Sequence, residues 1–255
     1  KIAAALIMSI AFVDAPLAKD MTAKPKAEET YTFPQSGKVY LQKTGSFRVK
    51  KVINDLTLLL DDGRIVRMVQ LDIPDRTLND PPTHVIEAHK KLKETFEGQN
   101  IILFQTMEPD RGRQNRMGHH LAHIVRSQDK IWAQGLLLTN GLARVRTTRE
   151  NYELAYEMLQ SEEKARQKST GIWSQPQYRV LTPETATNAM NSYQIVKGQA
   201  EGVALVRNTF YLNFGQNWRR DFTVSLPASL RKELQAAGFY PLKWKGRIIR
   251  ARGWI

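Results

Sequence analysis

The chain has 255 residues, enough for one or two domains with buried cores, and its lack of cysteine excludes disulfides and thiolate metal sites. Its 38 Lys and Arg against 25 Asp and Glu give a net charge of +13, which favours a polyanionic partner such as nucleic acid, anionic lipid or acidic glycan. Residues 193–255 hold 11 Lys and Arg against 3 Asp and Glu, and so carry +8 of that total. A solvated basic surface without a partner is the alternative interpretation.

The N-terminal residues resemble a secretory signal. An apolar run from Ile2 to Val13 follows Lys1, and the small residues Ala15 and Ala18 come after it, as at a signal-peptide cleavage zone. The run is too short to span a bilayer comfortably, so no transmembrane span is expected in the mature chain. We therefore expect residues 1–18 to be an incomplete signal peptide of an exported protein, periplasmic or secreted. A truncated apolar helix is the alternative.

The next regular segment predicts a β-hairpin. Residues 57–60 and 65–71 are rich in β-branched and aliphatic side chains, and Asp62-Gly63 between them favours a tight turn because glycine accepts a positive φ. The second strand is expected to end at Asp72, since a proline follows two residues later and cannot donate to a strand ladder. Asp72 and Asp75 would then be presented at a strand end, where polar groups are placed for chemistry.

The remaining pattern predicts two folded parts. In the first, helices are expected at 84–97, with Thr83 as its N-cap, at 132–139 and at 151–168, and further strands at 101–104, 121–125 and 142–145. Together with the hairpin they predict a mainly β, α+β domain built on a small closed barrel. In the second, strands are expected at 195–207, 210–214, 222–226 and 243–255, and a short helix at 229–237.

Composition sets the expected boundaries of these parts. We predict linkers at 19–43 and 176–191, a first domain at 44–175, and a basic β-rich domain at 192–255. Alternating apolar residues in the last domain indicate a second barrel, possibly of the OB (oligonucleotide/oligosaccharide-binding) type. Its final strand stops without a turn, so the chain is expected to continue beyond the last residue given.

Several segments of the first domain carry recognisable motifs in a fixed order and spacing. They are VINDLTLLL, VRMVQLDIPD, NRMGHHLAHI and TGIWS, spread over residues 44–174. In these motifs the domain resembles the staphylococcal nuclease (thermonuclease) family. The resemblance implies a five-stranded OB barrel with three helices. It also implies metal-assisted phosphodiester hydrolysis, in which carboxylates hold Ca²⁺, a carboxylate activates water and two arginines neutralise the phosphoryl oxygens.

The resemblance assigns the candidate site residues, with departures. Arg67 matches the first phosphate-binding arginine, Asp72 matches a metal-ligand aspartate, and Asp75 stands at the general base but is one methylene shorter than the family's glutamate. Leu56 occupies the position of the other ligand aspartate, and a leucine cannot coordinate a hard cation. His119 replaces the second arginine, and a neutral imidazole lacks the charged fork of a guanidinium.

The neighbour of Leu56 is the one carboxylate that could replace the lost ligand. Asp55 would reach the site only if the strand register slipped by one residue, which would turn side chains to opposite faces. The candidate metal ligands are therefore Asp55 and Asp72, for a divalent cation with Ca²⁺ disfavoured. The candidate catalytic residues are Arg67, Asp75 and His119.

Some of these candidate residues also have a purely structural interpretation. His119 and His123 share a strand face and could ligate a transition metal with Asp72 or Asp75, or could be satisfied barrel or surface histidines. Arg67 could form a structural ion pair with either aspartate and have no catalytic role.

Cationic residues in two regions are candidates for binding nucleic acid, with an ordinary solvated surface as the alternative. The first region is a polar loop and the second interleaves cations with tryptophans, as single-strand binding grooves do. The candidates are Arg111, Arg113 and Arg116 in the loop, and Arg219, Arg220, Lys243, Lys245, Arg247 and Arg250 in the second domain.

The sequence thus predicts a thermonuclease-family protein that binds nucleic acid or another polyanion, with a degenerate site and weak or absent Ca²⁺-dependent hydrolysis. One alternative is an active nuclease that uses Arg67, Asp72, Asp75 and His119 with a different metal. Another is a non-catalytic interaction module of the cell envelope.

Overall fold

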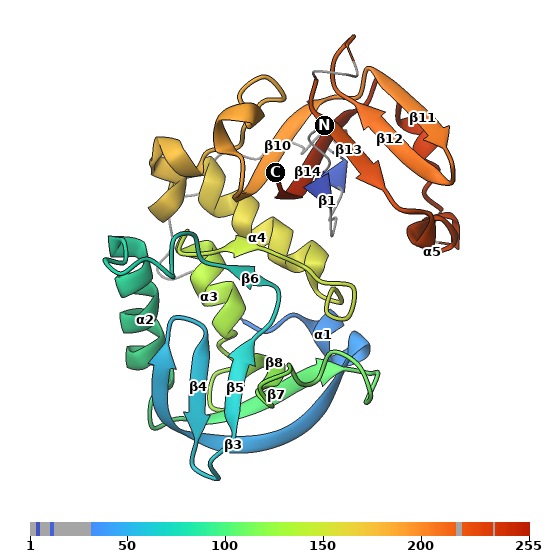
Figure 1. Cartoon of the computed structure of the whole chain (residues 1–255). Helices are drawn as coiled ribbons and strands as arrows, with labels where there is room; N and C mark the ends of the chain where they lie inside the picture. The colour runs from blue at the N-terminus through green and yellow to red at the C-terminus, as the bar shows by residue number, and fades with distance from the viewer. Residues whose placement is uncertain (1–3, 6–10, 13–31, 218–220, 237) are drawn as a thin grey trace, which may run out of the picture. The chain divides into compact units, whose positions relative to one another are not determined.

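A computed structural model describes residues 4–5, 11–12, 32–217, 221–236 and 238–255 (Figure 1). The chain divides into two compact units: one within Lys24–Tyr178, here called the barrel unit, and a second that includes Arg179–Ile255, here called the C-terminal unit. Of the predicted signal peptide, only Ala4–Ala5 (β1) and Ala11–Phe12 (β2) lie within the described residues. Among the described helices, none is long and apolar enough to cross a bilayer.

The barrel unit contains the predicted closed five-stranded barrel. Its strands follow the order β3-β4-β5-β8-β7, and all neighbours are antiparallel except β5 and β8. β3 is long enough to pair with both β4 and β7, and its register shifts bend it round the barrel. The strands are β3 (Leu41–Asn54), β4 (Thr57–Leu60), β5 (Ile65–Met68), β7 (Asn100–Thr106) and β8 (His120–Arg126).

Inward-facing aliphatic side chains fill the barrel. Leu58, Leu60 and Val66 are fully buried, and the alternation of side chains along each strand places them on the inner face. The hairpin turn lies at Asp62-Gly63 as predicted, with Gly63 at φ +88°.

The three predicted helices are present, each with slightly shifted ends: α2 (Thr83–Phe96), α3 (Ala133–Thr139) and α4 (Ala155–Gln167). Thr83 is not the N-cap of α2, because that position is Pro82 and no side chain caps the helix. A further helix, α1 (Gln35–Tyr40), lies in the stretch 19–43, which was predicted to be a linker. The unit ends in two 3₁₀ helices, η1 (Gly171–Ser174) and η2 (Pro176–Tyr178).

The predicted strand 65–71 is wrong in its second half, and this difference shapes the site. β5 ends at Met68, and Gln70 adopts a left-handed backbone at φ +63°, which breaks the strand. The chain resumes as β6 (Leu71–Asp72), which pairs with β9 (Arg144–Val145) in a separate two-stranded sheet. Asp72 is therefore carried off the barrel and faces Arg144 across this sheet.

The C-terminal unit is β-rich, but its described strands form two sheets and not the closed barrel suggested by the alternation. One sheet has the order β1-β13-β12-β11 and the other β10-β14-β2. The predicted strand 195–207 is split into β10 (Tyr193–Gln199) and β11 (Gly202–Val206), one in each sheet. The other strands are β12 (Thr209–Asn213), β13 (Thr223–Leu226) and β14 (Ile248–Trp254).

Short helices occupy the rest of the C-terminal unit. They are η3 (Ala186–Ala189), η4 (Ala228–Leu230), α5 (Arg231–Ala236) and η5 (Pro241–Trp244). The predicted strand 243–255 therefore begins only at Ile248, because η5 occupies its first residues. Phe210, Leu212 and Val224 are among the buried residues of this unit's core.

Candidate functional site

The site assigned by resemblance lies where the turn after β3, the outer face of β5, and β6 with its following loop come together. Arg67 lies within electrostatic range of Asp55, Arg76 and Arg146, and Arg76 lies within range of Asp72 as well. The structure therefore brings Arg67 near one predicted metal ligand, Asp55, and Arg76 near both Asp55 and Asp72. It also adds arginines that the sequence analysis did not include.

Asp55 is bound by Arg76. The carboxylate lies in the two-residue turn between β3 and β4 and is only 4% exposed. Arg76 donates from Nε to Asp55 Oδ2 and from Nη2 to Oδ1, both at 2.8 Å, which is the bidentate geometry that guanidinium and carboxylate favour. The hydrogen bond to Asp55 raises the pKa of Arg76 above its ordinary value despite partial burial. Asp55 thus forms a fixed, nearly buried ion pair.

Asp72 is bound by Arg144. The pairing of β6 with β9 places the two residues opposite each other, and Arg144 donates to Asp72 Oδ2 from Nη2 at 2.7 Å and from Nε at 3.1 Å. Arg146 approaches the other carboxylate oxygen at 3.9 Å. The side chains of Asp72 and Arg144 are 14% and 5% exposed, so this pair is also largely shielded from water.

Asp75 is held by a tyrosine. Its backbone is left-handed, at φ +57°, and the hydroxyl of Tyr178 donates to its Oδ2 at 2.6 Å. Burial and the contact with Asp75 raise the pKa of Tyr178 to about 12. The Tyr178 ring packs edge-on against His84, whose Nε2 lies 2.9 Å from the carbonyl oxygen of Pro74. The carboxylate at the general-base position is therefore engaged by the end of the barrel unit.

Arg67 is the unpaired cation of the site. It is half-buried, and no described residue forms an ion pair or hydrogen bond with its guanidinium. Burial lowers its pKa, and the positive charge of Arg76 lowers it further. A pairing of Arg67 with Asp72 or Asp75 is wrong as a prediction, because those carboxylates are bound to Arg144 and Tyr178. The guanidinium of Arg67 is thus a positively charged donor in a site whose Asp55 and Asp72 carboxylates are already paired with other arginines.

His119 and His123, the two candidate metal-ligand histidines, have different surroundings. His123 is buried inside the barrel unit, where it accepts a hydrogen bond from Trp132 Nε1 at 3.3 Å and lies 3.2 Å from the amide of Gln70. Burial lowers the pKa of His123 to about 3, so the ring is neutral at pH 7. His119 is half-buried immediately before β8, and its backbone N–H donates to Asn115 Oδ1. His123 is accordingly a buried histidine of the barrel core.

The donor set does not fit a hard cation. Leu56 is core, at 1% exposure, and the carboxylates of Asp55 and Asp72 each already face a guanidinium. Within the described ranges, no group of three or more His, Cys, Asp or Glu side chains is placed to hold a metal. A Ca²⁺ ion at this site would have to displace arginines.

The other cationic candidates are dispersed. Arg113 is structural, because it donates to the carbonyl oxygens of Thr106 and Met107 and to Gln42 Oε1, whereas Arg111 and Arg116 are exposed. In the C-terminal unit Lys243 lies 5.2 Å from the ring centroid of Tyr240. There Lys245 and Arg247 are exposed and Arg250 is half-buried, while Arg219 and Arg220 fall outside the described residues.

Sequence reasoning missed Arg76, Arg144, Arg146 and Tyr178. The spacing of Arg144 and Arg146 by two residues on a short strand was the available signal, since it puts both on one face. Arg76 follows Asp75 directly, and nothing local showed that it turns back to Asp55. Tyr178 is separated by 103 residues from its partner and could not be assigned from sequence.

A closed five-stranded barrel with packed helices defines an α+β protein of the OB class. Residues 65–175 match the family model described as staphylococcal nuclease homologue. This match confirms the resemblance over that range, which contains Arg67, Asp72, Asp75 and most of their partners. This part of the chain is a staphylococcal-nuclease-like domain, and the family suggests nuclease or nucleic-acid-binding function. A comparison with curated proteins gave no match.

Proposed function

We propose that the barrel unit binds the phosphate backbone of nucleic acid, or a similar polyanion, without Ca²⁺-dependent hydrolysis. The observation that carries this proposal is that Arg76 and Arg144 occupy the two carboxylates assigned to the metal, at 2.8 and 2.7 Å. A guanidinium in place of a metal ion neutralises the carboxylate charge but supplies no Lewis acid and no metal-bound water.

Charge at the site supports binding of an anion. Four arginines (Arg67, Arg76, Arg144 and Arg146) gather around the carboxylates of Asp55 and Asp72. Arg67 has no carboxylate partner among the described residues, and an arginine fork matches a phosphate. Phosphate contacts of this kind position nucleic acid without reading its sequence.

The same geometry argues against efficient cleavage. Asp75 is bound to Tyr178 and is shorter than the glutamate it replaces, while His119 lacks the charge of the second arginine. An active nuclease with a different metal remains the competing proposal, and an envelope interaction module is the third. We also propose that the protein is exported, on the strength of the apolar run of residues 2–13 alone.

Binding is tested by titrating a labelled single-stranded oligonucleotide with the full chain at increasing salt. We expect affinity to fall linearly with the logarithm of salt concentration, since counterions are released. Arg67→Gln should reduce the magnitude of that slope by about 1. Lys90→Gln removes the same charge from the outer face of α2, where the side chain is 72% exposed, and should leave the slope unchanged. Equal effects of the two variants would contradict a phosphate contact at Arg67.

A further inference from the structure

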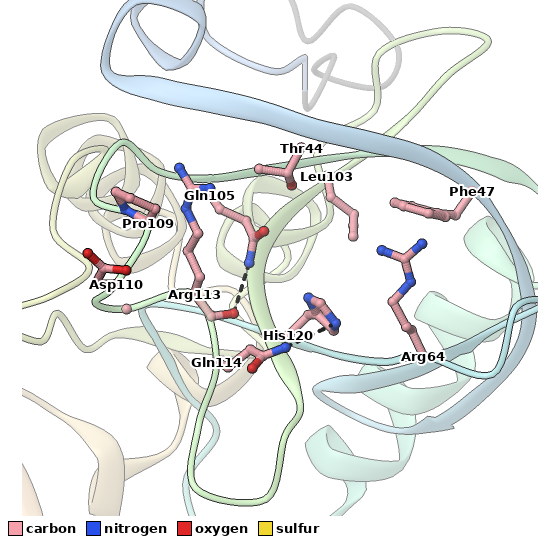
Figure 2. Close-up of a pocket in the computed structure, with 11 residues that line it drawn as sticks. Thr44, Phe47, Arg64, Leu103, Gln105, Pro109, Asp110, Arg113, Gln114 and His120 are labelled. Carbon is pink, nitrogen blue, oxygen red and sulfur yellow. Dashed lines mark hydrogen bonds between the residues drawn. The ribbon is translucent and has the colours of Figure 1, made fainter.

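The barrel unit contains a polar hollow of about 470 Å³ whose arginines are already engaged (Figure 2). Arg64 donates to Asp62, and Arg113 donates to Gln42 and to main-chain carbonyl oxygens. Figure 2 shows the two guanidinium groups apart, with His120 between them in this view. The hollow therefore does not gather its charged groups at a single ligand position.

The C-terminal unit, in contrast, leaves one strand edge open. β11 (Gly202–Val206) is the last strand of the sheet β1-β13-β12-β11, and no described strand lies beyond it (Figure 1). Native edge strands are commonly protected from other strands by a proline, a charged side chain or a bulge. β11 has none of these, because its sequence is GVALV and it pairs with β12 in unbroken register. Such an edge can accept a further strand.

The turn that joins β11 to β12 determines which main-chain groups point away from the sheet. Val206 and Thr209 face each other across a two-residue loop, in which Arg207 and Asn208 have φ values of +45° and +68°. Two successive positive φ values are typical of a type I′ hairpin turn. The residues that close such a hairpin hydrogen-bond to each other, so Val206 turns its N–H and C=O towards β12.

The alternation of hydrogen bonds along antiparallel strands then defines the open edge. Ala204 lies two residues before Val206, so its N–H and C=O also turn towards β12. The N–H and C=O groups of Val203 and Leu205 turn the other way. Among the described residues, none hydrogen-bonds to these outward groups. The edge thus presents main-chain donors and acceptors at the spacing of a strand ladder.

An apolar side chain beside these groups is also only partly covered. Val203 packs against the core of the C-terminal unit, and η5 contacts β11 and contributes the buried Trp244 to that core. Leu205 lies on the same face of β11 as Val203, because side chains two apart on a strand share a face. Its side chain is nevertheless 39% exposed. A strand added at this edge would cover it.

The two ends of β11 carry opposite charges. Glu201 precedes the strand and Arg207 follows it; both are exposed, and neither side chain forms an ion pair with a described residue. Each lies three residues from Ala204. If two β11 strands pair antiparallel about Ala204, Glu201 lies opposite Arg207 of the partner subunit, and Val203 lies opposite Leu205 of the partner subunit. The edge is therefore complementary to itself, as a two-fold interface requires.

We propose that β11 is a dimerisation edge, at which two copies of the chain pair antiparallel through residues 201–207 with Ala204 on the two-fold axis. Val203 and Leu205 exchange main-chain hydrogen bonds between the copies, and the added strand covers Leu205. The charges of Glu201 and Arg207 fix the register, since a shifted pairing would separate them. The association uses the C-terminal unit and does not depend on nucleic-acid binding.

Sedimentation velocity of the full chain at increasing concentration tests the pairing. We expect a monomer at about 1 µM and a growing fraction of dimer towards about 1 mM, because a single strand pair makes a small interface. Leu205→Pro should abolish the dimer, since it removes an outward N–H and leaves the ladder to β12 intact. Thermal unfolding shows whether this variant is folded. A wild-type chain that stays monomeric throughout would overturn the proposal and leave the edge to an extended peptide of another protein.

Charge reversal tests the register with substitutions at exposed positions. Glu201→Lys would bring two cations together at each end of the strand pair, and Arg207→Glu two anions, so each variant alone should dimerise about tenfold more weakly. An equimolar mixture of the two variants should dimerise as the wild type does, because each end of a mixed dimer joins opposite charges. Within one chain the two positions are roughly 20 Å apart along the strand, so this recovery requires two copies.

Lys197→Glu is the matched control, because it makes the same charge change as Arg207→Glu at an exposed position of β10, in the other sheet. It should leave the dimer unchanged. A dimer that survives both reversals, or a mixture that dimerises no better than either variant alone, would assign the association to another surface and overturn the pairing at β11.

Discussion

Replacement of Arg144 by methionine tests the ion pair that occupies the assigned metal ligand. The substitution keeps most of the buried side-chain volume but leaves the Asp72 carboxylate, 14% exposed, with Arg146 at 3.9 Å and Arg76 within electrostatic range. Removing one partner of a buried pair costs about 3–5 kcal/mol, and the remaining arginines favour the lower end. For a unit of this size, about 3 kcal/mol corresponds to a fall in Tm of roughly 6–12 °C.

The assay is urea and thermal unfolding at pH 7, with and without millimolar Ca²⁺. Arg146→Met is the matched control, because that side chain is 43% exposed and should contribute less than about 1 kcal/mol. Ca²⁺ should raise the Tm of Arg144→Met, where the carboxylate is no longer occupied, and leave that of the wild type unchanged. A loss below about 1 kcal/mol in Arg144→Met, or a Ca²⁺-dependent rise in the wild type, would refute the reasoning.

Three further predictions concern the frame of the barrel unit. Gly141→Ala should lower the free energy of unfolding in urea by about 3 kcal/mol or more, because φ is +64° and the added methyl group would lie 2.0 Å from a backbone carbonyl oxygen. Gly63→Ala is the control: φ is +88° but the space is open, so the loss should be only about 1 kcal/mol. The pKa of His123 is about 3 in the folded chain and about 6.5 in the unfolded chain, so the free energy of unfolding should fall by up to about 1.4 kcal/mol per pH unit as pH is lowered from 6.5 to 3. His123→Gln should flatten this pH dependence, and an unchanged slope would contradict the prediction. Tyr178→Phe should lower stability by about 1 kcal/mol through loss of the Asp75 hydrogen bond and should leave oligonucleotide affinity unchanged, as measured by the salt titration.

Local sequence signals were sufficient for most of the barrel. The hairpin at Asp62-Gly63 and the apolar face of α2 depend on neighbours within one turn or one strand, and the structure contains both. The departure at Gln70 was not foreseeable, because its left-handed backbone is stabilised by contacts outside the segment. The residue lies beside His123, and its carbonyl oxygen accepts from the N–H of Arg146.

The ion pairs of the candidate site could not be predicted from the sequence. The motifs assign Arg67, Asp72 and Asp75 to the site residue by residue, and that assignment stays a prediction. Which cation meets which carboxylate depends on contacts between distant segments, such as the pairing of β6 with β9 across 72 residues. Composition shows an excess of arginine but cannot show where each guanidinium lies.

The most direct test of the central claim is to incubate labelled single-stranded DNA and RNA with the chain and with Asp75→Ala at low salt. Ca²⁺, Mg²⁺, Mn²⁺ or Zn²⁺ is added in turn, and binding and fragment length are measured in the same samples. The account predicts that the oligonucleotides are bound and recovered at full length in every sample. Metal-dependent cleavage by the wild type that Asp75→Ala abolishes would contradict it.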